Sequence, residues 1–186
     1  MIALGVQIGA PKEAGWEDPI GLLSDCHRRI ERFLGVLRLV ARHDASFPLH
    51  EEARQATEAA LHYFNTSGIL HTTDEENSLF PRLRQALRRS QESESALRLL
   101  EDEHRSAEKL HETAGKLAAK WITAPLNKEE AKELRASLEA LTQLYSEHIR
   151  YEDTVLFPAA RRLLDAEEIG AIGAELKIRR APAAIA

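Results

Sequence analysis

The stretch LHTTDEENSLFP, from Leu70 to Pro81, returns in altered form as EHIRYEDTVLFP, from Glu147 to Pro158. Both copies read His-x-x-x-Glu followed by Leu-Phe-Pro at the same offsets, and the second copy begins 77 residues after the first. Residues four apart in a helix lie on the same face. The repeat therefore predicts two equivalent helices, each of which presents an imidazole next to a carboxylate.

The same offset relates polar residues of two further helices, because His27 corresponds to His104 and Glu31 corresponds to Glu108. Apolar residues recur three or four positions apart on either side of the histidines, which is typical of a helix with one buried face. Six polar residues fall on these apolar faces and are expected in the core: His27, His71, Glu75, His104, His148 and Glu152.

The composition indicates one globular domain. The chain has 186 residues, 30% of them charged and 44% apolar, and a net charge of -5 that argues against nucleic acid as a partner. No run approaches the ~20 apolar residues of a membrane span, and no signal peptide is recognisable. The single cysteine, Cys26, excludes an internal disulfide and fits a reducing compartment. We expect a cytoplasmic protein.

The helical patterns predict an all-α, up-down-up-down four-helix bundle. Residues 1–18 are expected to form an irregular N-terminal arm, residues 19–165 the bundle, and residues 166–186 a short C-terminal helix and tail. Asn127 with Glu130 is a predicted capping pair, and Asp165 is predicted to cap the last helix. The expected bundle helices are Pro19–His43, Leu49–Arg89 with a bend near Gly68 or Pro81, Glu92–Ile122, and a fourth that ends near Leu164.

Two carboxylates on buried faces require a partner. A buried carboxylate without one costs several kcal/mol, comparable to the whole stability of a domain. No Lys or Arg occupies a matching core position near Glu75 or Glu152. One His-x-x-x-Glu pair would be an ordinary helix feature, but two copies in register with two more inward histidines favour a metal cation, for which imidazole and carboxylate are ligands.

These motifs resemble the hemerythrin-like family, whose domain is often called the His-His-Glu cation-binding domain. The resemblance spans about Ile20 to Leu164, and EEIGAIGAELKIRR resembles the C-terminal helix of the family. It implies a four-helix bundle around a non-haem di-iron site, with two iron ions joined by an oxo or hydroxo bridge. The ligands carried over by motif would be His27, His71, Glu75, His104, His148 and Glu152, with the two glutamates bridging.

The sequence departs from the oxygen-carrying hemerythrins, which have a second histidine where this chain has Glu108. It is more similar to bacterial proteins linked to iron-centre repair and nitric-oxide handling, and to eukaryotic iron-sensing domains. The expected function is therefore to bind or reduce a small oxidant, namely oxygen, nitric oxide or peroxide. The alternatives are a non-enzymatic iron or oxygen sensor, or a structural site for zinc or a single ion.

Counting bonds indicates room for such a ligand. Two six-coordinate irons need about twelve bonds, and the proposed ligands with one bridge supply about ten, which leaves roughly two open positions. Glu31 and Glu108 either coordinate metal or hydrogen-bond to the ligands, and Tyr145 either donates to an iron-bound ligand or fills space. Turnover would require an electron-donor protein, for which the Arg-rich stretch 82–89 is either a docking surface or simply a solvated face.

Overall fold

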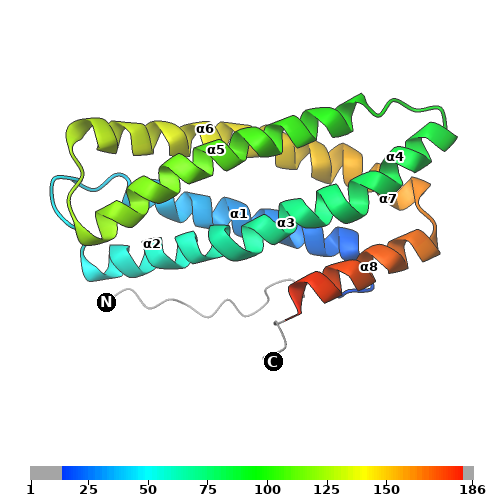
Figure 1. Ribbon diagram of the computed structural model, residues 1–186, viewed down its shortest axis with the longest axis horizontal. Helices are drawn as coiled ribbons and strands as arrows, with labels where there is room; N and C mark the ends of the chain where they lie inside the picture. The colour runs from blue at the N-terminus through cyan, green and yellow to red at the C-terminus, as the bar shows by residue number, and fades with distance from the viewer. Residues whose placement is uncertain (1–13, 182–186) are drawn as a thin grey trace.

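The computed structural model describes residues 14–181, and no strand occurs within that range (Figure 1). The predicted all-α bundle is confirmed. The helical segments along the chain are α1 (Pro19–Val40), α2 (Glu51–Tyr63), η1 (Phe64–Gly68), α3 (Ile69–Asp74), η2 (Glu75–Leu79), α4 (Phe80–Arg89), α5 (Ser95–Thr123), α6 (Lys128–Tyr151), η3 (Glu152–Leu156), α7 (Phe157–Leu163) and α8 (Ala166–Arg180).

These segments form four long rods: α1, then α2 through α4, then α5, then α6 through α7 (Figure 1). Helix α1 packs against α2, α2 against α5, α5 against α6, and α6 against α1, which closes the ring of a bundle. Helix α5 begins at Ser95 rather than at the predicted Glu92. The reason is Gln91, whose φ of 58° ends α4 and lets the Glu92 N–H donate to Leu87 O. Residues 1–13 of the predicted arm and 182–186 of the predicted tail lie outside the described range.

Three π-helical turns, η1, η2 and η3, interrupt the second and fourth rods, and the sequence analysis did not predict them. The last two are equivalent: Phe80 N–H donates to Glu75 O, and Phe157 N–H donates to Glu152 O. Pro81 follows the first of these turns and Pro158 follows the second, and a proline has no N–H for the usual bond to the residue four before it. The repeated Leu-Phe-Pro therefore accounts for a widened turn that starts at each of the two buried glutamates.

Helix α8 lies outside the four rods and packs against α1, α3 and η2. Its start is capped as predicted: the Asp165 side chain accepts a hydrogen bond from Glu168 N–H, and the Glu168 side chain accepts one from Asp165 N–H. Asn127 and Glu130 form the same reciprocal capping box at the start of α6. Ile172 and Leu176 of this helix are fully buried, and Arg179 and Arg180 of its last turn contact the buried Asp74.

The Arg-rich stretch 82–89 is occupied by ion pairs within the protein. Four of its guanidinium groups contact glutamates at N···O distances of 2.6 to 3.4 Å, on α8, on α5 and in the turn before α5. These pairs make it a salt-bridged helix face rather than an unpaired basic surface.

The core of the described residues has two large apolar clusters and a small one of Ile30, Tyr63 and Ile149, with the polar residues between the two large clusters. One cluster gathers around Leu34, Trp121 and Leu138, and the other around Leu23, Phe80 and Leu176. His27 lies on α1 between Leu23 of one cluster and Leu34 of the other. The apolar clusters above and below exclude water from the polar layer and hold its side chains in place.

Candidate metal centre

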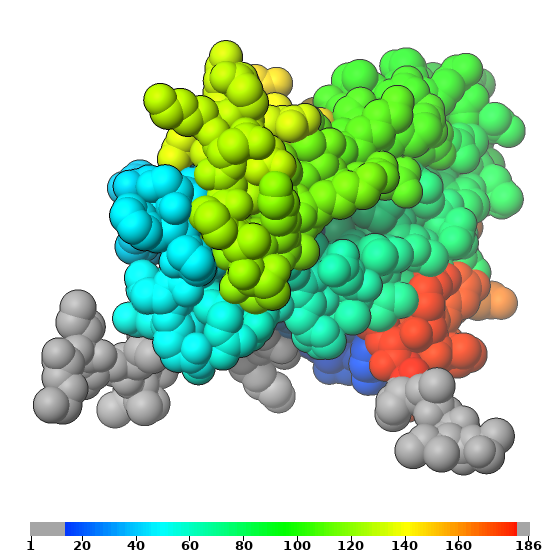
Figure 2. All heavy atoms as spheres, turned by 60° about the vertical axis from the view of Figure 1, so that its left-hand side comes forward, coloured from blue at the N-terminus to red at the C-terminus, as the bar shows by residue number. Residues whose placement is uncertain are grey.

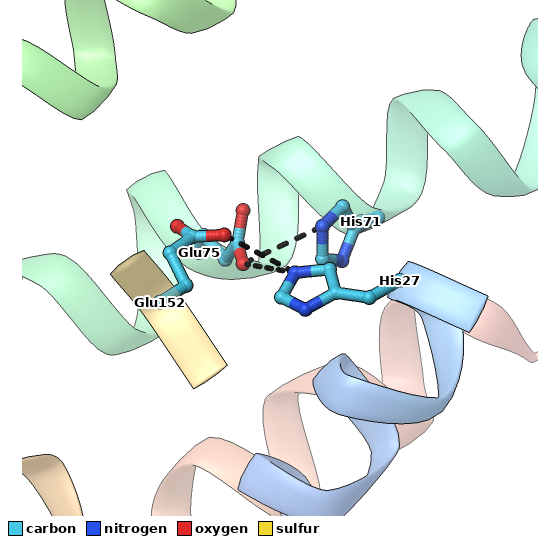
Figure 3. Close-up of side chains that lie close together, drawn as sticks. All are labelled: His27, His71, Glu75 and Glu152. Atoms are coloured by element: carbon cyan, nitrogen blue, oxygen red, sulfur yellow. Dashed lines mark ion pairs between the residues drawn. The ribbon is translucent and has the colours of Figure 1, made fainter. Parts of the chain in front are cut away.

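All six residues expected in the core are buried, with exposed fractions from 0% for the two glutamates to 8% for His104. They come from every rod of the bundle. His27 lies on α1, His71 on α3, His104 on α5 and His148 on α6, while Glu75 and Glu152 are the first residues of η2 and η3. In Figure 3 the His27, His71, Glu75 and Glu152 side chains point toward one another. The structure thus brings together the whole set.

The six side chains form two groups that share both carboxylates. Glu75 and Glu152 belong with His27 and His71 in one group, whose donor atoms all lie within 4.8 Å of one another. The same two glutamates belong with His104 and His148 in the other. Two cations held by two imidazoles each and joined by two carboxylates would use every donor of this arrangement.

The outward ring nitrogens of three imidazoles determine which tautomers are present. A carboxylate only accepts hydrogen bonds, so an Nδ1 next to one carries the proton, and the Nε2 of the neutral ring is then an acceptor. The three Nδ1–carboxylate pairs are His104 with Glu76 at 2.8 Å, His148 with Glu103 at 2.8 Å, and His27 with Asp153 at 3.1 Å.

The inward-facing atoms are then almost all acceptors without donors. His104 Nε2 lies 3.1 Å from His148 Nε2, and His27 Nε2 lies 3.1 Å from Glu152 Oε2. No carboxylate oxygen of Glu75 or Glu152 has a hydrogen-bond partner, and within residues 14–181 their ion-pair contacts are all with imidazoles. Lone pairs that face one another in a buried space repel unless a cation or protons lie between them. The donor set therefore fits metal ions.

Protons occupy this role in the metal-free protein. Burial lowers the pKa of His104, but Glu75 and Glu76 outweigh it and raise this pKa to about 9. Burial likewise opposes protonation of His27, yet Asp153 and Glu152 raise its pKa well above the usual value. His71 differs, because burial lowers its pKa to about 4. Metal binding must displace the protons from the raised histidines.

This exchange predicts opposite pH dependences for the two forms. Stability from protonated His104 is complete below pH 6.5 and is lost as pH rises toward 9, so the metal-free protein should melt at lower temperature across that range. At a metal concentration too low to saturate the site, the Tm of the protein with metal should increase as pH rises over the same range, because fewer protons compete with the metal for the histidine nitrogens. Thermal melts with chelator and with Fe(II) test this, and parallel slopes would contradict it.

The three carboxylates that hold the Nδ1 atoms were not identified from the sequence. The signal was present, because the 77-residue offset that relates His71 to His148 also relates Glu76 to Asp153. The same offset relates Glu103 to Cys26, which is not a carboxylate. Glu103 is the partner of His148 Nδ1, and the equivalent position for His71 is Cys26. His71 Nδ1 accordingly has no partner among the described residues. The repeat is thus broken at one position of the metal centre.

The other three candidates lie away from the donor atoms. Glu31 is exposed on α1, and Glu108 is exposed on α5. Each follows a buried residue of the helix stripe by one position, which turns its side chain about 100° away. Neither glutamate belongs to the two donor groups, and the Nδ1 atoms are held by other carboxylates, so neither of the two roles considered for Glu31 and Glu108 is seen. The Tyr145 and His148 rings are edge-on to each other with their centroids 6.4 Å apart, and the Tyr145 hydroxyl lies 2.9 Å from His111 Nε2.

A substitution at Glu103 tests the Nδ1 partners. Loss of such a partner lowers metal affinity by about 10–100-fold. We expect Glu103→Gln to fall in this range when Fe(II) is titrated against a competing chelator. Glu108→Gln on the same helix is the matched control and should retain the parent affinity. Equal affinities for the two variants would show that the Glu103 contact has no role in metal binding.

Fold and site together define a helical-bundle protein with a histidine and carboxylate centre for cations. A family model for the Hemerythrin HHE cation binding domain matches residues 18–160, and the chain belongs to this family. It is also 29% identical over 177 residues to an uncharacterized protein of Haemophilus influenzae, a match that covers 94% of this chain and 98% of that protein. Within residues 14–181, no helix combines the length and apolar character needed to cross a membrane.

Proposed function

We propose that the protein binds two iron ions between its four core histidines and two core glutamates, and that it binds or reduces a small oxidant there. The observation that carries the proposal is the sharing of Glu75 and Glu152 by two imidazole pairs; the four oxygens of these glutamates have no hydrogen-bond partner in residues 14–181. Imidazole with carboxylate suits iron, and bridging carboxylates suit a pair of ions.

Access from solvent supports a role beyond structure. His104 lines a pocket of about 540 Å³ that lies between α3 and α5, so a small molecule can approach the centre from that side. Iron bound in the centre would offer open coordination positions to oxygen, nitric oxide or peroxide. The chain itself holds three of the four imidazoles in one tautomer through Glu76, Glu103 and Asp153, and its two large apolar clusters flank the centre along the bundle.

Metal analysis together with ultraviolet-visible spectra tests the proposal. We expect two irons per chain, charge-transfer bands of an oxo-bridged diferric centre in the oxidised protein, and a spectral change when oxygen, nitric oxide or peroxide is added to the reduced protein. Repeated turnover would in addition require an electron-donor protein. Zinc in place of iron, or a single ion per chain, would overturn the proposal.

A sensor is the second candidate, and one observation favours it. Glu75 directly follows Asp74, which is held by helix α8, so metal occupancy and the docking of α8 act on adjacent residues. In a sensor, metal occupancy would set the stability of the bundle and hence partner binding. A large melting-temperature shift with iron, without any reaction with the three oxidants, would favour this reading.

A further inference from the structure

The pocket between α3 and α5 is far larger than a diatomic ligand requires. Its volume is about 540 Å³, whereas a water molecule in the liquid occupies only about 30 Å³. Figure 2 shows this face hollowed between the green spheres of α5 and the blue-green spheres of α3. Small residues open the space, because Gly68, Ala107, Ala114 and Gly115 all line it. A pocket of this size matches the range of organic-ligand sites, about 300–1,000 Å³.

The walls are mostly apolar; polar groups come from Asn65, Thr72, Thr73 and Asn77 and from a pair of residues on α5 and α6. Tyr145 Oη and His111 Nε2 lie 2.9 Å apart among these walls. A phenol oxygen that takes part in one hydrogen bond still has a lone pair, so Tyr145 can accept a bond from a ligand hydroxyl in either tautomer of His111. The apolar lining side chains are Ile30, Leu37, Leu61, Phe64, Leu138 and Leu141.

The charges around the pocket select against an anion. Glu76, Glu108 and Glu112 line it, and both lining cations are paired, Arg105 with Asp102 and His104 with Glu76. Burial lowers the pKa of His111 to about 4, so its ring is neutral at pH 7. An anion in this space would meet carboxylates and no unpaired cation among the lining residues, at a cost of several kcal/mol.

We propose that the α3–α5 pocket is a binding site for a neutral aromatic molecule with a hydroxyl group, such as a one- or two-ring phenol. The rings occupy the apolar walls and the hydroxyl donates to Tyr145 Oη. His104 belongs to both the pocket lining and the metal centre, whereas Tyr145, His111 and the apolar walls include no metal donor. We therefore expect the phenol to bind with or without metal in the centre.

Titration of the full chain with 2-naphthol tests this, followed by the fluorescence of the probe with and without chelator. We expect saturable binding at a 1:1 ratio, and at least about ten-fold weaker binding of 2-naphthoate, which has the same rings and a negative charge. Absence of saturable 2-naphthol binding, or equal binding of the anion, would overturn the proposal. Iron content is measured separately, so a failure here leaves the proposed metal site untouched.

Two variants locate the probe. A Cβ at Gly115 would meet nothing nearer than Leu61 Cδ2 at 4.0 Å, so Gly115→Leu extends into the free space and also removes a glycine from a helix. We expect it to weaken 2-naphthol binding at least about ten-fold, with unchanged circular dichroism and metal content. Tyr145→Phe should weaken 2-naphthol about five-fold and leave naphthalene unaffected, because one hydrogen bond is worth about 1 kcal/mol. Unchanged 2-naphthol binding in Gly115→Leu would place the probe elsewhere and refute the assignment.

Discussion

The Glu152→Gln variant is expected to lose both metal ions. Glu152 belongs to both donor groups, so its replacement by a neutral amide would remove a ligand from each of the two proposed cations and the charge that offsets them. We expect metal affinity to fall by at least about 100-fold. A ligand at a thousand times its Kd stabilises by about 4 kcal/mol, which in a domain of this size corresponds to a Tm increase of roughly 8–16 °C. Iron should produce this increase in the parent and less than about 6 °C in the variant, because a 100-fold weaker site at the same iron concentration contributes at most about 1.4 kcal/mol.

The metal-free forms provide an internal check on this result. In the metal-free protein Glu152 faces His27 and His148 at 3.1 and 3.2 Å, so metal-free Glu152→Gln should melt lower than the metal-free parent, and the effect of metal is the Tm difference between the loaded and metal-free forms of each protein. Glu147→Gln, an exposed change five residues earlier, is the control and should keep both ions. A Glu152→Gln protein that still binds two irons per chain would mean that this carboxylate is not shared between cations.

The second large effect is expected at the ion pair between helix α8 and the bundle. The Asp74 carboxylate is fully buried and contacts Arg179 and Arg180, with Arg180 Nε at 2.7 Å. Arg179 also donates to Ser78 Oγ at 3.1 Å. Removing the partners of a buried charge costs about 3–5 kcal/mol. We expect the double variant Arg179→Ala/Arg180→Ala to melt about 6–20 °C lower, since 1 kcal/mol shifts Tm by roughly 2–4 °C in chains of this length.

Two comparisons separate the buried charge from the loss of helix contacts. Adding Asp74→Asn to the double variant removes the unpaired charge and should recover much of the lost stability. Arg82→Ala breaks the partly exposed pair between Arg82 of α4 and Glu175 of α8, and this change should cost less than about 1 kcal/mol. If the double variant were no less stable than Arg82→Ala, α8 would not be held by Asp74.

Much of the bundle could be predicted from the sequence because helical periodicity is a local property. The spacing of apolar residues around His27 and His104 determines which face of each helix is buried, whatever the helix packs against. The caps at Asn127 and Asp165 were predictable for the same reason, since each bond joins residues three apart. The π turns were not, because they depend on how the chain relaxes before Pro81 and Pro158.

The environment of the donors required the tertiary structure. Spacing placed Glu31 one turn after His27, but the buried stripe continues through Ile30 and Leu34 and leaves Glu31 exposed. The carboxylate that holds His27 comes instead from Asp153, which is 126 residues away along the chain. Contacts between rods depend on crossing angles and side-chain packing, which no local pattern specifies.

The sequence by itself determined that two imidazole–carboxylate pairs and two further imidazoles occupy buried helix faces, because covalent spacing and helix pitch are sufficient for that. Only the tertiary structure decided that Glu75 and Glu152 are shared by both imidazole pairs, that the outer nitrogen of His71 has no partner in the described part of the chain, and that a pocket opens beside His104. These features are distances between different helices, and such distances are set by the packing of the whole core.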